Sequence, residues 1–161
     1  MQFAKDSFYR ELRARLTALN PERVALIRGC VRPGILVEEA EGFFSQVPND
    51  IFVLRWPGTS AEPMPPSTLI AAECEIGYQT VGTPAFGGLD RGRKLSEMDS
   101  ELLAILAPFQ TQKIDYSTTP PTEMLTRIFW EEPVFGPLIA QGDRLCRTVK
   151  VRIYSYQEEG E

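Results

Sequence analysis

The glycine-rich segment GGLDRGRK, residues 87–94, is the first candidate for chemistry, because two spaced glycines precede a sequence with helical periodicity. A nucleotide-binding P-loop has the pattern GxxxxGK followed by Ser or Thr, and its lysine and hydroxyl bind phosphate and magnesium. Gly87 and Gly92 have this spacing, but Arg93 stands at the lysine position and Lys94 at the hydroxyl position. Both chemical positions differ, so the segment does not predict a nucleotide site.

The longer segment TVGTPAFGGLDRGRK, residues 80–94, combines an aromatic residue with three basic residues. Its glycines allow a mobile loop that becomes ordered when it docks. We therefore expect residues 81–94 to form a long irregular loop that contacts a partner protein. The expected contact residues are Phe86, Arg91, Arg93 and Lys94.

Glu73 and Glu75 are the second candidate, because alternate residues of a strand lie on one face, about 6.6 Å apart. An inverting glycosidase places its two carboxylates at a similar separation. Every Glu-x-Glu strand has this spacing, however, and solvated strand faces commonly carry such residues. A structural role is the favoured interpretation, and a small hydrolase that also uses Glu131 and Asp143 is the alternative.

Further carboxylates lie beside Trp130, where Glu131 and Glu132 are adjacent, and at Asp143. Their oxygens are the ligands that hard metal ions prefer. Nothing in their spacing favours a metal site over a solvated turn, and no cofactor is expected. The chain has no histidine, which removes the usual general base near neutral pH and the commonest transition-metal ligand.

Lys150, Arg152 and Tyr154 are the third candidate set, since they alternate with apolar residues near the end of the chain, as does Tyr156. Basic and aromatic side chains on one face suit a nucleic acid or a protein partner. A solvated outer face is the more frequent arrangement. The net charge is −5, from 22 acidic and 17 basic residues, so specific or general binding of nucleic acid is not expected.

Length and composition predict a single domain, residues 1–161, that buries a core without disulfides. The three cysteines have no CxxC spacing and are expected to be small buried hydrophobes, namely Cys30, Cys74 and Cys146. No apolar run is long enough to span a membrane. The charged N-terminus, MQFAKDSFYRELRARL, lacks the apolar centre of a secretory signal, so we expect a cytoplasmic protein.

Hydrophobic periodicity predicts two helices. The first extends from about Ala4 to Leu19 and ends at Asn20-Pro21; its apolar stripe consists of Phe8, Leu12, Leu16 and Leu19. The second has Ser96 as its N-cap and ends before Pro108; its apolar face consists of Met98, Leu102, Ile105 and Leu106.

Period-2 patterns and strand-forming residues predict the strands. The predicted strands are residues 50–56, in the interior of the sheet, and residues 70–78, 111–116, 125–131 and 145–156. Residues 24–27 and 35–37 are apolar pieces to which no structure is assigned. Residues 57–67 hold four prolines and predict a surface loop, which is either a binding loop or a passive connector.

The order of these elements has no regular alternation of strand and helix, and the later strands have hairpin-like spacing. It predicts an α+β fold with a mainly antiparallel sheet, in which an N-terminal helix and a second helix pack on one face. No internal repeat interrupts this order.

The succession FYRELRARLTAL, DIFVLRW, STLIAAECEIGYQTV, SEMDSELLAIL and DRLCRTVKVRIYSYQEE resembles the phage tail terminator proteins, also called tail completion proteins. Members are small α+β subunits with an N-terminal helix, a sheet, a second helix and a closing strand in this order. The likeness covers most of the chain and consists of pattern and order without a signature motif. The acidic end, with Glu158, Glu159 and Glu161, also matches, whereas residues 57–67 and 81–94 depart from the pattern.

The resemblance implies a structural protein rather than an enzyme. Members of the family form a six-fold ring that caps the tail tube, ends its polymerisation and offers a surface to the head connector. The implied partners are further copies of the chain in a homo-hexamer, the tail tube protein and the head–tail connector protein, with no membrane. The implied location is the bacterial cytoplasm during assembly and then the virion tail. A carboxylate-dependent hydrolase and a monomeric α+β binding domain are the alternatives.

Overall fold

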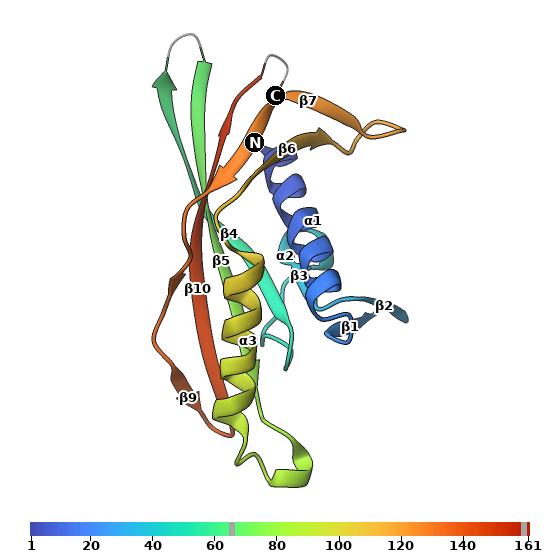
Figure 1. The fold of residues 1–161 in the computed structure, drawn as a ribbon, viewed down its shortest axis with the longest axis vertical. Helices are drawn as coiled ribbons and strands as arrows, with labels where there is room; N and C mark the ends of the chain where they lie inside the picture. Colours follow the sequence, from blue (N-terminus) through green and yellow to red (C-terminus); the bar gives the residue numbers. More distant parts are fainter. Residues whose placement is uncertain (65–66, 159–160) are drawn as a thin grey trace.

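A computed structural model describes residues 1–64, 67–158 and 161 of the chain. Its centre is a pair of long antiparallel strands, β5 (Ser67–Thr80) and β10 (Arg144–Tyr156), which follow the long axis of the molecule (Figure 1). Their register pairs Leu145 with Thr80 at one end and Tyr156 with Leu69 at the other. Both strands alternate apolar and polar residues, so this register buries one face of the ladder along most of its length.

The other strands extend the sheet on both sides of this pair, in the order β3-β4-β5-β10-β7-β6. The short strands β8 and β9 also pair with β10, and only β3 and β4 run parallel among the described residues. These strands are β3 (Ile35–Val37), β4 (Phe52–Met64), β6 (Gln110–Asp115), β7 (Thr122–Trp130), β8 (Val134–Phe135) and β9 (Ile139–Gln141). The five strands predicted from the sequence are all confirmed, with shifted ends.

Two helices, α1 (Gln2–Leu19) and α3 (Arg91–Ile105), cover one face of the sheet (Figure 1). Phe8 of α1 is fully buried, and its ring meets that of Trp130 edge to face at a centroid distance of 5.1 Å. The predicted α+β fold, with both helices on one face, is thus confirmed. None of the helices within the described residues has the length and apolar content needed to cross a membrane.

The first predicted helix buries its stripe as expected, except that its last residue, Leu19, is half exposed. Three further short elements are β1 (Val24–Ile27), β2 (Cys30–Pro33) and α2 (Glu38–Glu41). β1 and β2 form a separate two-stranded antiparallel sheet that projects from the body (Figure 1). Cys30 is therefore exposed, which corrects the prediction for this cysteine, whereas Cys74 is buried and Cys146 half-buried.

The proline-rich segment is not the predicted loop over residues 57–64, because β4 continues through it to Met64. A bulge between Arg55 and Gly58 takes up Pro57, after which β4 pairs again with β5. β3 pairs only with the beginning of β4, so the rest of β4 is an edge strand, where the missing N–H of proline is tolerated. Residues 65 and 66 of the predicted loop lie outside the described residues.

Helix α3 begins at Arg91, so the predicted start at Ser96 is wrong. Residues 81–94 contain a short 3₁₀ helix, η1 (Pro84–Phe86), and the first turn of α3. Asp90 stands directly before the helix, where a negative charge is favourable. Its carboxylate accepts hydrogen bonds from the backbone N–H and hydroxyl of Thr83, at 2.8 and 2.5 Å. These bonds lower the pKa of Asp90 and close the preceding loop.

A fully buried lysine, Lys113 of β6, forms ion pairs with Glu158 and Glu161. Its Nζ lies 2.6 Å from Oε2 of Glu161 and 3.4 Å from Oε1 of Glu158, and it donates to the carbonyl of Tyr156 at 2.8 Å. The N-terminal amine also contacts Glu161, at 3.2 Å. We call this group of four charges the terminal clamp, because it joins both ends of the chain to the sheet.

Candidate functional site

The face of the sheet that the helices leave uncovered carries the predicted carboxylates and cations directly opposite one another. The register of β5 and β10 pairs Glu75 with Lys150 and Glu73 with Arg152. Nζ of Lys150 lies 3.0 Å from Glu75, and Nη2 of Arg152 lies 3.6 Å from Glu73. The hydrogen bond and charge of Glu75 raise the pKa of Lys150. The two predicted sets therefore form one surface of cross-strand ion pairs.

Residues that follow β7 complete this surface. Glu131, Glu132 and Val134 border the same ion pairs, and together they line a shallow depression of about 180 Å³. The hydroxyl of Tyr154 donates to Oε1 of Glu131 at 2.5 Å, and its ring stacks on Phe129 with a centroid distance of 5.2 Å. We call this the acidic depression, because its four carboxylates, of Glu73, Glu75, Glu131 and Glu132, outnumber the cations of Lys150 and Arg152.

Asp143 does not join these carboxylates. It lies at the turn between β9 and β10, seven residues before Lys150 and so about 23 Å away along the strand. The four residues named as actors of a hydrolase are thus split, with Glu73, Glu75 and Glu131 in the depression and Asp143 elsewhere. Within residues 1–64, 67–158 and 161, no three acidic or cysteine side chains are placed to hold a metal ion.

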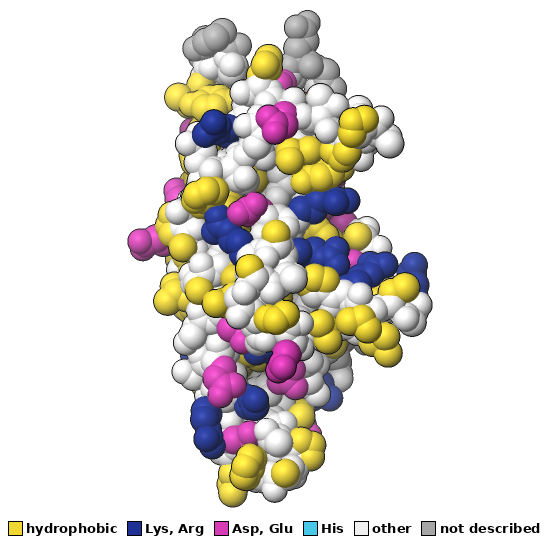
Figure 2. Space-filling model, turned by 45° about the vertical axis from the view of Figure 1, so that its right-hand side comes forward, with side chains coloured by type: hydrophobic (Ala, Val, Ile, Leu, Met, Phe, Trp, Pro, Cys, Tyr) yellow, Lys and Arg dark blue, Asp and Glu magenta, His cyan; other side chains and the backbone are white. Residues whose placement is uncertain are grey.

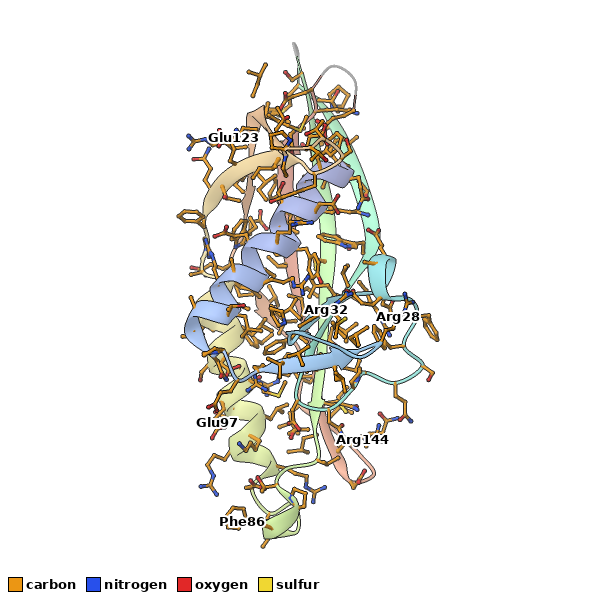
Figure 3. The ribbon with its side chains drawn as sticks, turned by 90° about the vertical axis from the view of Figure 1, so that its right-hand side faces the viewer. Arg28, Arg32, Phe86, Glu97, Glu123 and Arg144 are labelled. Atoms are coloured by element: carbon orange, nitrogen blue, oxygen red, sulfur yellow. The ribbon has the colours of Figure 1, made fainter. Side chains whose placement is uncertain are left out.

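The predicted contact residues of the loop lie at one end of the long axis, far from the depression. Phe86 is 60 % exposed there, at the foot of the molecule in Figure 3. Arg91 points inward: its guanidinium donates to the carbonyls of Gly88 and Asp143, at 2.9 and 2.7 Å. Lys94 contacts Glu97 at 3.5 Å within α3, whereas Arg93 is exposed.

The β1–β2 hairpin is a surface that the sequence patterns did not predict. Val24, Leu26 and Val31 are 45 %, 71 % and 69 % exposed on it. The residues of its two-residue turn, Arg28 and Gly29, both have positive φ, of 50° and 79°, as primed hairpin turns require. The sequence signal that could have predicted this hairpin is the dipeptide Arg28-Gly29 between two short apolar runs.

Figure 2 shows hydrophobic side chains on the part of the surface that projects to the right, beside a group of basic side chains. The hairpin therefore offers apolar and basic groups together, whereas the acidic depression offers mainly carboxylates. Exposed apolar side chains gathered in one place are typical of contacts with other proteins, and complementary charges add specificity to such contacts. Comparison of the chain with protein-family models and with curated protein sequences gave no match.

Proposed function

We propose that the protein is a structural subunit that assembles with further copies of itself into a closed ring, which caps a phage or phage-like tail tube. The β1–β2 hairpin carries this proposal, because Leu26 and Val31 are 71 % and 69 % exposed on a projecting two-stranded sheet. Such a hairpin is marginally stable in water by itself. A neighbouring subunit that covers these side chains stabilises it and removes the apolar surface from solvent.

The position of exposed apolar residues at two opposite edges supports a ring. The hairpin adjoins β3, at one edge of the sheet order, while β8 and β9 flank β10 on the other side from β5. Val134 and Ile139 of these short strands are 67 % and 55 % exposed. A contact between two different edges is heterologous, and it repeats from subunit to subunit until the rotation closes a ring.

The order of elements supports a ring of the tail terminator kind. An N-terminal helix, a sheet, a second helix and a closing strand are the parts of the tail terminator proteins that this chain resembles, which form six-fold rings. In this role the protein stops growth of the tube, contacts the tube protein and the head–tail connector protein, and passes from the bacterial cytoplasm into the virion tail. Phe86, exposed at one end of the long axis (Figure 3), and the exposed Arg93 in the first turn of α3 are suited to such contacts.

The carboxylates of the acidic depression favour the structural function over a hydrolase. Glu73 and Glu75, the pair with glycosidase-like spacing, each face a cation across the strands at 3.6 and 3.0 Å. Both side chains are partly exposed and already engaged in ion pairs, as on an ordinary solvated strand face.

Native mass spectrometry of the purified chain over a range of concentrations tests the proposal, with and without magnesium. We expect a species of six times the 18.1 kDa chain mass, whose share rises with concentration. A single species of 18.1 kDa at every concentration would contradict it and favour a monomeric binding domain.

A further inference from the structure

The β1–β2 hairpin has one face anchored on the body and one face free. Ala25 on the anchored face packs with Leu36 and Val53, in a small apolar cluster at the β3 edge of the sheet. Strand alternation directs Leu26 and Val31 to the opposite face, where the register makes them a cross-strand pair. The free face is therefore a narrow apolar strip.

The tip of the hairpin adds a positive charge to this strip. Arg28, in the turn, is exposed and makes no hydrogen bond or ion pair with the described residues (Figure 3). Arg32 of β2, by contrast, contacts Glu41 at 3.2 Å within the chain. Arg28 is thus the charge of the hairpin that is available to another molecule.

The acidic depression has the complementary properties. Val134 on its border is 67 % exposed and supplies an apolar contact. Glu132 is exposed and, like Arg28, has no hydrogen-bond or ion-pair partner among the described residues. β8, which carries Val134, lies four strand positions from β3 in the sheet order, about 19 Å across the sheet. The hairpin of a chain therefore lies across the sheet from the β8 border of its own depression.

We propose that the β1–β2 hairpin of one subunit docks on the acidic depression of the next subunit, where Leu26 and Val31 cover Val134 and Arg28 faces Glu132. The docking rests on the proposed ring function and assigns its repeating contact. Opposite charge selects this pairing, because hairpin against hairpin would place the Arg28 charges together without a counter-charge. The ring repeats the contact around its circumference, so each single contact can be weak.

A charge exchange tests the docking by native mass at a concentration where the unmodified chain assembles. Arg28→Glu alone and Glu132→Arg alone are each expected to lower the assembled fraction at least tenfold. The double variant R28E/E132R is expected to restore it, since each contact then has opposite charges again. The matched control is R28E/E123R, because Glu123 is also an exposed carboxylate, on β7 outside the depression, and should restore nothing (Figure 3).

The outcomes separate the docking from the ring itself. If the unmodified chain is monomeric at every concentration, both proposals fail. If it assembles and R28E assembles equally well, or R28E/E132R is not restored, the ring stands and the docking is wrong. Arg28 and Glu132 are exposed and without partners in the described chain, so circular dichroism should show that all variants fold.

The exposed thiol of Cys30 provides an independent test, because it lies on β2 next to the turn of the hairpin, one residue before Val31 of the free face. In the V134C variant, a short bis-maleimide linker should join Cys30 of one subunit to residue 134 of the next and give a ladder up to the hexamer. The C30S/V134C variant should lose the ladder, and L103C on α3 should not give it. An assembled V134C protein without a ladder would overturn the docking.

Discussion

Replacement of Lys113 by methionine tests the terminal clamp. Lys113 is fully buried and lies 2.6 Å from Oε2 of Glu161, whose own side chain is only 2 % exposed. Methionine keeps the length of the side chain but removes its charge, so the carboxylate of Glu161 retains the N-terminal amine, at 3.2 Å, as its cation and a hydrogen bond from the N–H of Glu158 at 2.8 Å. Removal of one partner of a buried ion pair costs about 3–5 kcal/mol. For a chain of this size, that lowers the melting temperature by about 6–20 °C.

Urea unfolding at pH 7, followed by tryptophan fluorescence, measures this cost. The matched control is Lys150→Met, which also removes a lysine from an ion pair, but one whose lysine side chain is 68 % exposed. We expect the control to keep its unfolding midpoint, since exposed pairs contribute little. If Lys113→Met lowers the free energy of unfolding by less than about 1 kcal/mol, which is the range of an exposed ion pair, the terminal clamp does not stabilise the fold as argued.

The effect of Lys113→Met should also depend on pH. Burial raises the pKa of Glu158, but hydrogen bonds from Thr126 and from the N–H of Leu125, with the charge of Lys113, outweigh burial and lower the pKa to about 2. The pKa of Glu161 is lowered as well. A carboxylate with a lowered folded-state pKa contributes stability above its ordinary pKa of 4.5, and this is lost as pH falls towards 2. The difference in free energy of unfolding between Lys113→Met and the unmodified chain should therefore become smaller in acid.

Three further changes test the core. Phe8→Ala should lower the free energy of unfolding by about 3–5 kcal/mol in urea, whereas Leu89→Ala, at a residue 93 % exposed, should change it by less than about 0.5 kcal/mol. Gly136→Ala should lower the melting temperature, because its Cβ would lie 2.8 Å from the carbonyl oxygen of Thr148. Burial raises the pKa of Tyr78 above its ordinary 10.0, so in an absorbance titration Tyr78→Phe should remove a phenol that ionises only on alkaline unfolding. If Tyr78→Phe instead removes a phenol that titrates near pH 10 in the folded chain, this burial is contradicted.

The sequence predicted those parts of the fold that local patterns determine. The alternation over residues 70–78 identified β5 and its buried face, and the apolar stripe of α1 was correct up to Leu19. The surface loop predicted from the prolines of β4 was wrong, because an edge strand tolerates proline. Only the sheet order shows that this part of β4 is an edge strand. The start of α3 was wrong because Asp90, bound by Thr83, precedes a polar first turn without apolar periodicity.

The candidate surfaces were also predicted only where local sequence patterns determine them. The sequence identified Glu73, Glu75, Lys150 and Arg152 as residues on open strand faces, but their opposition depends on the register of two strands far apart in the chain. Lys113 was not predicted as a buried charge, because its partners lie more than forty positions further on. The exposed face of the β1–β2 hairpin depends on which side packs on Leu36, and short apolar runs do not determine that.

Electron microscopy of the purified chain, at concentrations where native mass detects the largest species, tests the ring most directly. The proposed function predicts closed particles with six-fold rotational symmetry and a central opening. Open filaments, two-fold particles or dispersed 18.1 kDa subunits alone would contradict a ring-forming tail terminator.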